Sequence, residues 1–355
     1  MLQHPEKYLY IPYGRGGGLD SNLWDLEIII NAALSMRRVP IIKEMATSKN
    51  HRLDNIEKDA VINWDKYIDL SATKILRAKP NGAVKRIPGT LQYVYERDFD
   101  FSLYSKRQVR FISSEQVHDK ENDQYPIICL LKDEDLSSLK KRDPPISSIN
   151  KLKFNSRGNF HHDSSLFTIF PPSKEVNDLT EIVLGYFGTT LVGMNTLSNM
   201  LHNFLPRYRR ERKQFFKNSG CYACVHVRYV RNTKHASKLL EQQSQTLKES
   251  LSRTIAMAYK DSIGNLPLYI MSNIAEPDYF NFLKSKYDVY RYTDFKELRE
   301  QFVEQEVIDN DLLYSVEKNI MRHALVKIFP KRRNNMFIFK GEWGIRKALL
   351  KKKQE

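Results

Sequence analysis

A glycine-rich segment near the start of the chain is the first candidate for chemistry. Residues 13–20 read Tyr-Gly-Arg-Gly-Gly-Gly-Leu-Asp, with four glycines in five positions. A strand-like stretch precedes this segment and an amphipathic helix follows it, so the glycines let the backbone approach a ligand closely. The free amides of a helix N-terminus favour negative charge, such as a phosphate. The spacing matches neither G-x-G-x-x-G nor the P-loop, and a tight turn without a ligand is the alternative.

Two polar side chains end a later apolar strand, Val225-His226-Val227-Arg228. Strand alternation puts His226 and Arg228 on the same face. Ligands of open α/β sheets bind beyond the carboxyl ends of the strands, where a forked guanidinium suits two oxygens of a diphosphate. The pattern His-x-Arg is unspecific by itself, and a structural ion pair between Arg228 and a helix carboxylate explains it equally well.

Two further segments carry polar groups at expected element ends. The strand Leu268–Ser272 leads directly into Asn273. The stretch Asp309-Asn310-Asp311 opens a helix, and the carboxylate of Asp311 could accept hydrogen bonds from a base or a ribose. Either Asp309 or Asn310 is equally suited to be a plain N-cap.

The positive charge of the chain lies in its C-terminal half. The formal net charge is +15, and residues 205–238 contribute +9 of it through ten basic residues against one acid, Glu211. Residues 331–355 contribute +7. Such a field favours an anionic ligand or surface. A solvated basic face without a specific partner is the alternative for the run Arg207–Lys213.

Three cysteines, Cys129, Cys221 and Cys224, do not make a disulfide framework. Cys221 and Cys224 form a C-x-x-C pair, which is compatible with a metal or redox site. The surrounding residues also read as a buried strand, in which cysteine behaves as a small hydrophobic residue. We favour the structural interpretation.

Strand and helix patterns alternate along the chain and predict an α/β fold with parallel sheets and two domains. The first helix is expected from about Ser21, with Asp20 or Ser21 as N-cap, and Pro40 suggests an edge or early strand position for Val39–Ile42. Residues 133–165 are polar and rich in Pro and Ser, which predicts a loop or insertion. Strands are expected at 8–11, 39–42, 91–95, 127–131, 221–230, 268–272 and 289–292, and helices at 21–36, 175–217, 238–260, 277–286, 310–328 and 343–352.

The chain shows no apolar run long enough to span a bilayer and no signal peptide at its start. We therefore expect either a cytoplasmic protein or a protein of the secretory pathway from which an N-terminal anchor has been removed. The pattern does not separate these two locations.

The order of these features resembles the GDP-fucose-dependent fucosyltransferases, in particular the protein O-fucosyltransferases and their α1,6-fucosyltransferase relatives. The resemblance covers most of the chain and is strongest at residues 8–42, 220–230 and 267–330. It implies a GT-B fold, in which two Rossmann-like domains face each other across a cleft. The expected domains are an acceptor-side domain at 1–200 with an insertion at 133–165, a nucleotide-sugar-binding domain at 201–335, and a helix at 336–355 that packs back on the first domain.

The resemblance implies an inverting glycosyltransferase that moves fucose, or a related deoxyhexose, from a GDP-sugar to a hydroxyl of a protein or glycan. Arg228 would bind the β-phosphate and stabilise the leaving diphosphate. His226 would line the nucleotide site, Asp311 would lie near the guanosine, and the three glycines Gly16, Gly17 and Gly18 would approach the sugar end of the donor. Basic side chains would neutralise the diphosphate, so no metal is expected.

The chain departs from the family pattern at two places. The position that carries Asn or Glu in some family branches is Gly18 or Leu19 here, which leaves Asp20 as the nearest candidate for a catalytic base. Asn334 and Asn335 occupy the place of two serines in a Ser-Ser-Phe turn, where their amides would donate to phosphate. Arg346 would correspond to the arginine that follows this turn.

Two other functions compete with the transferase. A catalytically inactive relative would bind a glycan or protein with the same fold. A basic nucleic-acid-binding protein would use Arg207–Lys213 and Lys351–Lys353, but the chain has no recognised nucleic-acid module. We therefore expect no nucleic-acid partner and no membrane span.

Overall fold

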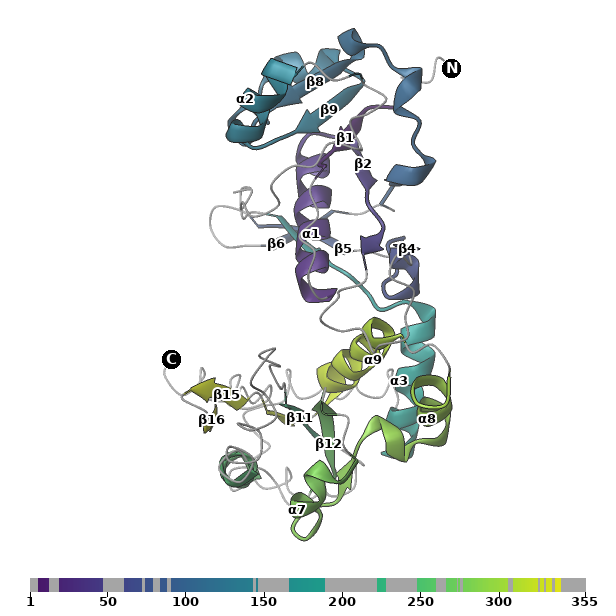
Figure 1. The fold of residues 1–355 in the computed structure, drawn as a ribbon, viewed down its shortest axis with the longest axis vertical. Coiled ribbons are helices and arrows are strands. Elements are labelled where there is room, and N and C mark those ends of the chain that lie inside the picture. The colour runs from purple at the N-terminus through teal and green to yellow at the C-terminus, as the bar shows by residue number, and fades with distance from the viewer. Residues whose placement is uncertain are drawn as a thin grey trace. The chain divides into compact units, whose positions relative to one another are not determined.

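The structure is a computed structural model of the chain (Figure 1). It describes residues 6–12, 19–46, 61–71, 74–78, 84–87, 91–142, 145, 166–188, 222–227, 248–259, 266–272, 274, 277–305, 309–324, 326–328, 330–333 and 336–339. The chain divides into two compact units, Met1–Lys174 and Glu175–Glu355. The domain boundary expected at residue 200 and the helix expected at 343–352 lie outside the described residues.

The first unit is built on a sheet of five parallel strands. Their order is β7 (Val94–Tyr95), β2 (Val39–Ile42), β1 (Tyr8–Tyr10), β9 (Ile127–Leu130) and β8 (Val109–Ile112). The strands expected near residues 8, 39 and 127 are confirmed, whereas the one expected at 91–95 is only two residues long. Strand β2 lies between β7 and β1, so the edge position suggested by Pro40 is wrong. Pro40 is instead the second residue of the strand, the early position that we also considered.

Helix α1 (Leu19–Ser35) contacts β1 and β2. Its residues Leu26, Ile30 and Ala33 are buried at helical spacing, as the apolar stripe predicts. The helix begins at Leu19, so the expectation that Asp20 or Ser21 is its N-cap is wrong, and both residues lie in its first turn.

Aromatic side chains cover one face of this sheet. Tyr8 and Tyr10 contact Phe99 and Phe101 edge to face, with ring centroids 4.8 and 5.0 Å apart. Successive side chains of a strand point to opposite faces, so the fully buried Leu9 points away from this cluster. Three short 3-10 turns carry the aromatic segment from β7 to β8, namely η3 (Glu96–Asp98), η4 (Phe101–Leu103) and η5 (Lys106–Gln108).

Smaller antiparallel sheets complete the first unit. Strand β5 (Lys74–Ala78) pairs with β6 (Val84–Ile87) and β10 (Leu166–Ile169), and β3 (Met45–Ala46) pairs with β4 (Val61–Ile62). The loop expected at 133–165 begins instead with helix α2 (Asp133–Arg142). Three acidic residues in the first turn of α2 favour helix formation, because they complement the helix dipole.

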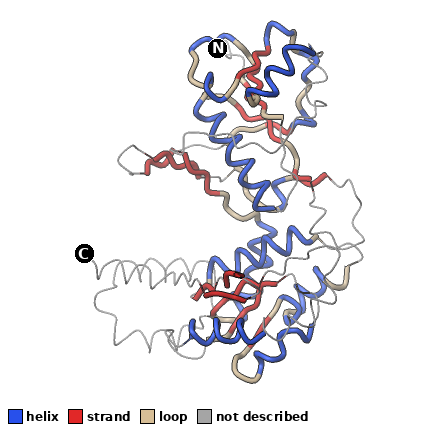
Figure 2. Tube along the Cα trace, turned by 60° about the vertical axis from the view of Figure 1, so that its left-hand side comes forward, coloured by secondary structure: helices blue, strands red, loops and turns tan. Residues whose placement is uncertain are grey.

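The second unit contains a sheet of four parallel strands, as the strand–helix alternation predicts. Their order is β13 (Val289–Tyr290), β12 (Leu268–Ser272), β11 (Ala223–Val227) and β14 (Val326–Ile328). Helices lie around the strands of this unit (Figure 2). They are α3 (Lys174–Tyr186), residues 248–259, η9 (Pro277–Phe280) with α7 (Asn281–Lys284), α8 (Lys296–Phe302) and α9 (Asn310–His323).

The end of α9 differs from the sequence prediction. The helix expected at 310–328 ends at His323, and the buried Val326 and Ile328 form strand β14 beside β11. Branched side chains at both positions fit a pleated, buried strand. A hairpin follows, made of β15 (Pro330–Arg333) and β16 (Met336–Phe339).

Helices α3 and α9 contact each other through polar groups. The amide of Asn319 donates to Asn177 Oδ1 and lies 3.2 Å from Thr180 Oγ1. Phe187, the residue that follows α3, stacks on Tyr222 with ring centroids 4.7 Å apart. These contacts connect α3 and the residue after it to other elements of the second unit. Across the part of the chain that the structure describes, no helix has the length and apolar character needed to cross a membrane.

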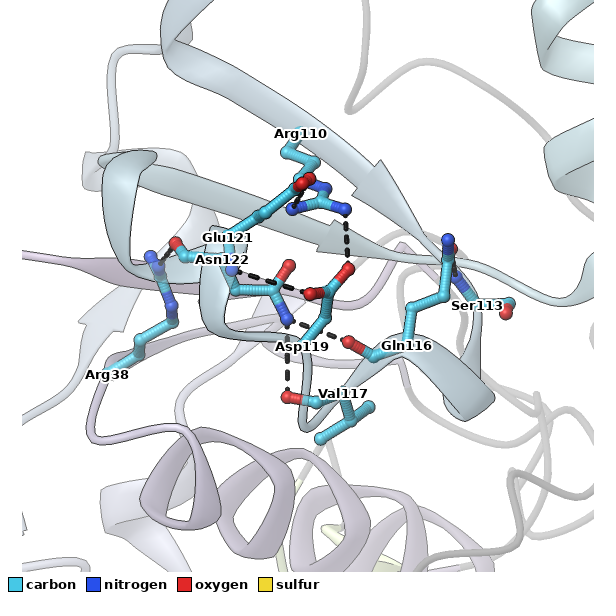
Figure 3. A network of polar contacts seen from close by, with 8 residues as sticks. All are labelled: Arg38, Arg110, Ser113, Gln116, Val117, Asp119, Glu121 and Asn122. Atoms are coloured by element: carbon cyan, nitrogen blue, oxygen red, sulfur yellow. Dashed lines mark hydrogen bonds and ion pairs between the residues drawn. The ribbon is translucent and has the colours of Figure 1, made fainter.

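A buried arginine holds the amino ends of the first sheet together. Arg38 immediately precedes β2, is 4% exposed, and donates to the carbonyls of Tyr8 and Pro126 at 3.2 and 3.1 Å. It also donates to the carbonyl of Asn122 (Figure 3). Burial lowers its pKa to about 10, so Arg38 keeps its charge at neutral pH. One side chain thus ties β1, β2 and the chain entering β9.

The loop between β8 and β9 is held in place by further polar contacts (Figure 3). Arg110 on β8 pairs with Asp119 at 2.8 Å and with Glu121 at 3.2 Å. Asn122 donates through its side chain to the carbonyls of Gln116 and Val117. The loop therefore presents the carbonyl of Asn122 to Arg38 in a fixed position.

Replacing Arg38 by methionine should destabilise the first unit by about 2 to 4 kcal/mol, because three carbonyls lose their hydrogen bonds to this buried guanidinium. Urea-induced unfolding measures this change. Arg107, an exposed arginine of η5, supplies the matched control. Arg107→Met should change the unfolding free energy by less than about 0.5 kcal/mol. Equal midpoints for the two variants would contradict the role given to Arg38.

Candidate functional site

The carboxyl edge of the second sheet is the edge at which its parallel strands end. His226 and Val227 close β11 there, in register with Met271 and Ser272 of β12. Helix α9 leads into the parallel strand β14, so it runs back along the sheet and begins near this edge. The carboxylate of Asp309 accepts a hydrogen bond from the amide of Leu312 at 2.9 Å, which confirms that Asp309 is the N-cap of α9.

Strand β11 and helix α9 meet through an aromatic contact. The ring of His226 lies 6.4 Å from the ring of Tyr314, centroid to centroid. The Lys318 ammonium, one turn further along α9, lies 5.7 Å from the centre of the Tyr314 ring. Asp311 lies three residues before Tyr314 on the same helix. The structure therefore brings two of the predicted site residues, His226 and Asp311, to the same edge of the sheet.

Asp311 is a buried acid at the start of α9, with 7% of its surface exposed. Burial, and secondly the nearby negative charge of Asp309, raise its pKa to about 6. Asp311 is therefore an ionised hydrogen-bond acceptor at neutral pH and a protonated acid below about pH 6. A carboxylate in this state can accept two hydrogen bonds from adjacent N–H groups of one ligand.

The chain leaving β12 is fixed by a series of hydrogen bonds. Ser272 Oγ donates to the carbonyl of Val227 at 2.9 Å and accepts from the amide of Ile274 at 3.1 Å. The carbonyl of Ile274 accepts from Arg291 Nη2 at 2.5 Å. The Arg291 guanidinium also lies over the Phe280 ring, 5.2 Å from its centre. These contacts connect the ends of β11 and β12 to the residue that follows β13.

Glu317 is a second buried acid on α9, and sequence reasoning missed both it and Arg291. The hydroxyl of Tyr269 donates to Glu317 Oε1 at 3.4 Å. Burial raises the pKa of Glu317 to about 8, although Arg291, Tyr269 and the amide of Ser272 act in the opposite direction. The sequence did contain one signal that Glu317 is buried. It lies within the apolar stripe of α9 that includes Val316 and Ile320, where a charged residue is unusual.

The carboxyl edge of the first sheet also carries charged residues. The Lys43 ammonium donates to the carbonyl of Pro12 at 3.1 Å and lies 3.5 Å from Glu96 Oε2. The hydroxyl of Tyr10 donates to the same oxygen at 2.8 Å. Pro12 is the last described residue before the glycine-rich segment. Lys43 therefore anchors the chain where it enters that segment.

Several predicted site residues lie outside the described residues, and their roles stay predictions. They are Gly16, Gly17, Gly18, Arg228, Asn334, Asn335 and Arg346. Asp20 lies in the first turn of α1, and its proposed role as a base also stays a prediction. Among the predicted residues, the structure thus locates the side chains of His226 and Asp311.

Two cysteines fit a structural role. Cys224 in β11 and Cys129 in β9 are buried, and burial raises the pKa of each thiol well above its ordinary value. A buried protonated thiol packs as a small hydrophobic group. Cys221 lies outside the described residues. Within the described ranges, no group of three or more His, Cys, Asp or Glu side chains is arranged to hold a metal ion.

Comparisons with known proteins give a weak structural likeness. No family model matches the sequence, and no curated protein matches it. Solved structures of POFUT1, a GDP-fucose protein O-fucosyltransferase, are similar over most of the chain. The apo form is 9% identical with a TM-score of 0.41, covering 100% of this chain and 96% of its own.

The complexes of POFUT1 with GDP and with GDP-fucose are 9% and 10% identical, with TM-scores of 0.42 and 0.39. Each covers 92% of this chain and 91% of its own. Similarity at this level does not assign an activity to this chain. The structure itself establishes a mixed α/β protein with two parallel sheets.

Glu317 should make stability depend on pH. Its folded pKa of about 8 lies above the ordinary value of 4.5, so its contribution is fully present below about pH 4.5 and is lost as the pH rises through about 8. The groups that face it are Tyr269 and Cys224 from the sheet, and Arg291 and Tyr292 after β13.

Urea-induced unfolding of the wild type and of Glu317→Gln between pH 5 and pH 8 tests this dependence. The stability of the wild type should fall relative to the variant as the pH rises, by up to about 1.4 kcal/mol per pH unit. The uncharged amide of glutamine cannot titrate, so the variant lacks this slope. Parallel curves for the two proteins would contradict a protonated Glu317.

Proposed function

We propose that this protein is an inverting glycosyltransferase that uses a GDP-sugar, most simply GDP-fucose, and transfers the sugar to a hydroxyl of a protein or glycan. The observation that carries the proposal is the meeting of β11 and α9 at the carboxyl edge of the second sheet. There the ring of His226 contacts Tyr314, and Asp311 lies one turn away. The assignment of guanine as the nucleobase and of fucose as the sugar rests on the sequence resemblance.

The carboxyl edge of a parallel sheet suits a nucleotide, because strand ends and a helix N-terminus converge there. Arg228 follows directly on the last residue of β11, and it is the proposed diphosphate ligand. Asp311 is the proposed acceptor for the guanine base, whose ring N–H and amino group are adjacent donors. The basic segment 205–238 adds a positive field that favours the diphosphate.

The proposed reaction is a single displacement at the anomeric carbon. The acceptor hydroxyl forms a bond to that carbon while the bond to the β-phosphate oxygen breaks, and the configuration inverts. The hydroxyl proton goes to a base, for which Asp20 is the sequence candidate. Negative charge grows on the departing oxygen, where a fixed guanidinium such as Arg228 stabilises the transition state. Basic side chains in this role would need no metal.

The proposal also includes the GT-B arrangement, with the donor diphosphate bound by the second unit and the glycine-rich segment of the first unit at its sugar end. In support, each unit carries its own parallel sheet with charged residues at the carboxyl edge. The acceptor would be bound by the first unit.

Calorimetry with GDP tests the phosphate site. Arg228→Ala should weaken GDP binding about 10- to 100-fold, because a charge-assisted hydrogen bond to phosphate is lost. Arg322, exposed on the last turn of α9, provides a control in the same unit. Arg322→Ala should leave the affinity within about twofold. Equal affinity in the wild type and Arg228→Ala would remove Arg228 from the site.

The pH dependence of GDP binding tests Asp311. Its carboxyl group is protonated below about pH 6 and then cannot accept both guanine donors, so wild-type affinity should fall as the pH drops through that value. Asp311→Asn should bind GDP more weakly at pH 7.5 and should lose this component of the pH profile. ADP, which lacks the adjacent donors, should bind equally to both proteins. If Asp311→Asn bound GDP as tightly as the wild type at pH 7.5, Asp311 would be excluded as the ligand of the guanine base.

Turnover separates a transferase from an inactive binding protein. Incubation with GDP-fucose should release GDP slowly even without an acceptor, since water can replace the acceptor hydroxyl. UDP-sugars tested in parallel should release no UDP. Tight GDP-fucose binding with no release and no transfer would favour the binding protein instead.

A further inference from the structure

We infer that Ser272 and Arg291 are positioning residues, which hold the peptide bond leading into Arg228 and so fix how that arginine meets a diphosphate. The inference rests on the proposed function, because it assigns a task to residues beside the proposed phosphate ligand. Neither residue is expected to touch the nucleotide. They act through the end of strand β11.

The contacts form one continuous chain from Arg291 to β11. The guanidinium of Arg291 donates to the carbonyl of Ile274, and the amide of Ile274 donates to Ser272 Oγ. The hydroxyl of Ser272 then donates to the carbonyl of Val227. Three hydrogen bonds therefore link the residue after β13 to the last residue of β11, across the intervening strand β12.

The last acceptor in this chain has a particular place in the covalent structure. The carbonyl of Val227 belongs to the peptide bond that joins Val227 to Arg228. Because a peptide bond is planar, fixing the direction of this carbonyl also fixes the direction of the N–H of the next residue. A hydrogen bond from Ser272 thus sets the direction in which the chain leaves the strand.

Arg291 itself is held on several sides. Its own amide donates to Asp294 Oδ2 at 2.6 Å. Its guanidinium lies over the rings of Phe280 and Tyr292, at 5.2 and 5.9 Å from their centres. The residue is 4% exposed, so water does not compete freely for its hydrogen bonds. Such a fixed donor can orient the end of β12 better than an exposed, mobile one.

The hydrogen-bond chain has features that a purely structural contact does not need. Ser272 Oγ accepts a hydrogen bond from the chain that leaves β12 and donates one to the end of β11. Its small hydroxyl therefore couples the ends of these two strands at the carboxyl edge. The end of β11 leads directly into Arg228, the proposed phosphate ligand. Burial raises the pKa of the nearby Glu317 carboxyl group to about 8, and its interaction with the backbone of Ser272 acts in the opposite direction.

A double-mutant cycle in GDP affinity tests the inference. Ser272→Ala, Arg228→Ala and the double variant are compared with the wild type by calorimetry, and circular dichroism checks that each is folded. Ser272→Ala should weaken GDP binding about tenfold in the wild type but less than about twofold in the Arg228→Ala background. The hydroxyl matters only while Arg228 is present to be positioned.

Thr254 supplies the matched control. Its buried hydroxyl donates to the carbonyl of Ser250 at 2.8 Å within the helix at 248–259, in the same unit. Thr254→Ala should leave GDP affinity within about twofold. The control separates the loss of one buried hydroxyl from the loss of the link to Val227.

The outcomes distinguish this inference from the function on which it rests. Absence of GDP binding by the folded wild type would overturn the proposed function and the inference together. Wild-type binding with equal, additive losses in both backgrounds would overturn the inference alone. The same conclusion would follow if Ser272→Ala bound GDP as tightly as the wild type. Non-additive losses, with Thr254→Ala unchanged, would support positioning through Arg228.

Discussion

Parallel pairing gathers the carboxyl ends of strands that are far apart in the sequence along one edge of a sheet. In the second unit this places the end of β11 beside the end of β12, 45 residues later in the chain. The helix that leads back to β14 then begins at the same edge. The meeting of His226 with Tyr314, and the hydrogen bonds through Ser272, exist because these strands point the same way.

Buried arginines occur at strand ends in both units. Arg38 binds carbonyls at the amino edge of the first sheet, and Arg291 binds a carbonyl at the carboxyl edge of the second. A carbonyl oxygen can accept two hydrogen bonds, and the Pro126 carbonyl accepts from both the amide of Tyr8 and Arg38. The forked guanidinium can reach several carbonyls at once and keeps its charge when buried. Each arginine therefore adds hydrogen bonds to backbone carbonyls at strand ends.

Much of the framework was predictable from local patterns. Apolar runs with short turns located β1, β2, β9, β11 and β12, and the polar stretch Asp309-Asn310-Asp311 located the start of α9, with Asp309 and Asn310 both open as its N-cap. The end of α9 was not predictable, because Val326 and Ile328 continue an apolar pattern that fits either a helix or a strand. Their pairing with β11 depends on residues about 100 positions away, which no local window contains.

The places of candidate site residues were predictable only where sequence position implied strand or helix ends. His226 and Asp311 were placed in this way, near the end of β11 and in the first turn of α9, and their roles in a site stay predictions. Arg291 and Glu317 were missed, because nothing near them in the sequence indicates that they approach Ser272 or Tyr269. A charged residue reads as solvent-exposed unless the tertiary contacts that bury it are known.

Strand β1 lies at the centre of the first sheet, although it precedes the other strands of that sheet in the sequence. Its partner β9 begins at Ile127, so one side of β1 stays unpaired until a segment about 120 residues further along has joined it. Until then the edge of β1 is open to pairing with other chains. The first sheet therefore closes through a contact between segments far apart in the sequence, which is the kind of contact that slows folding.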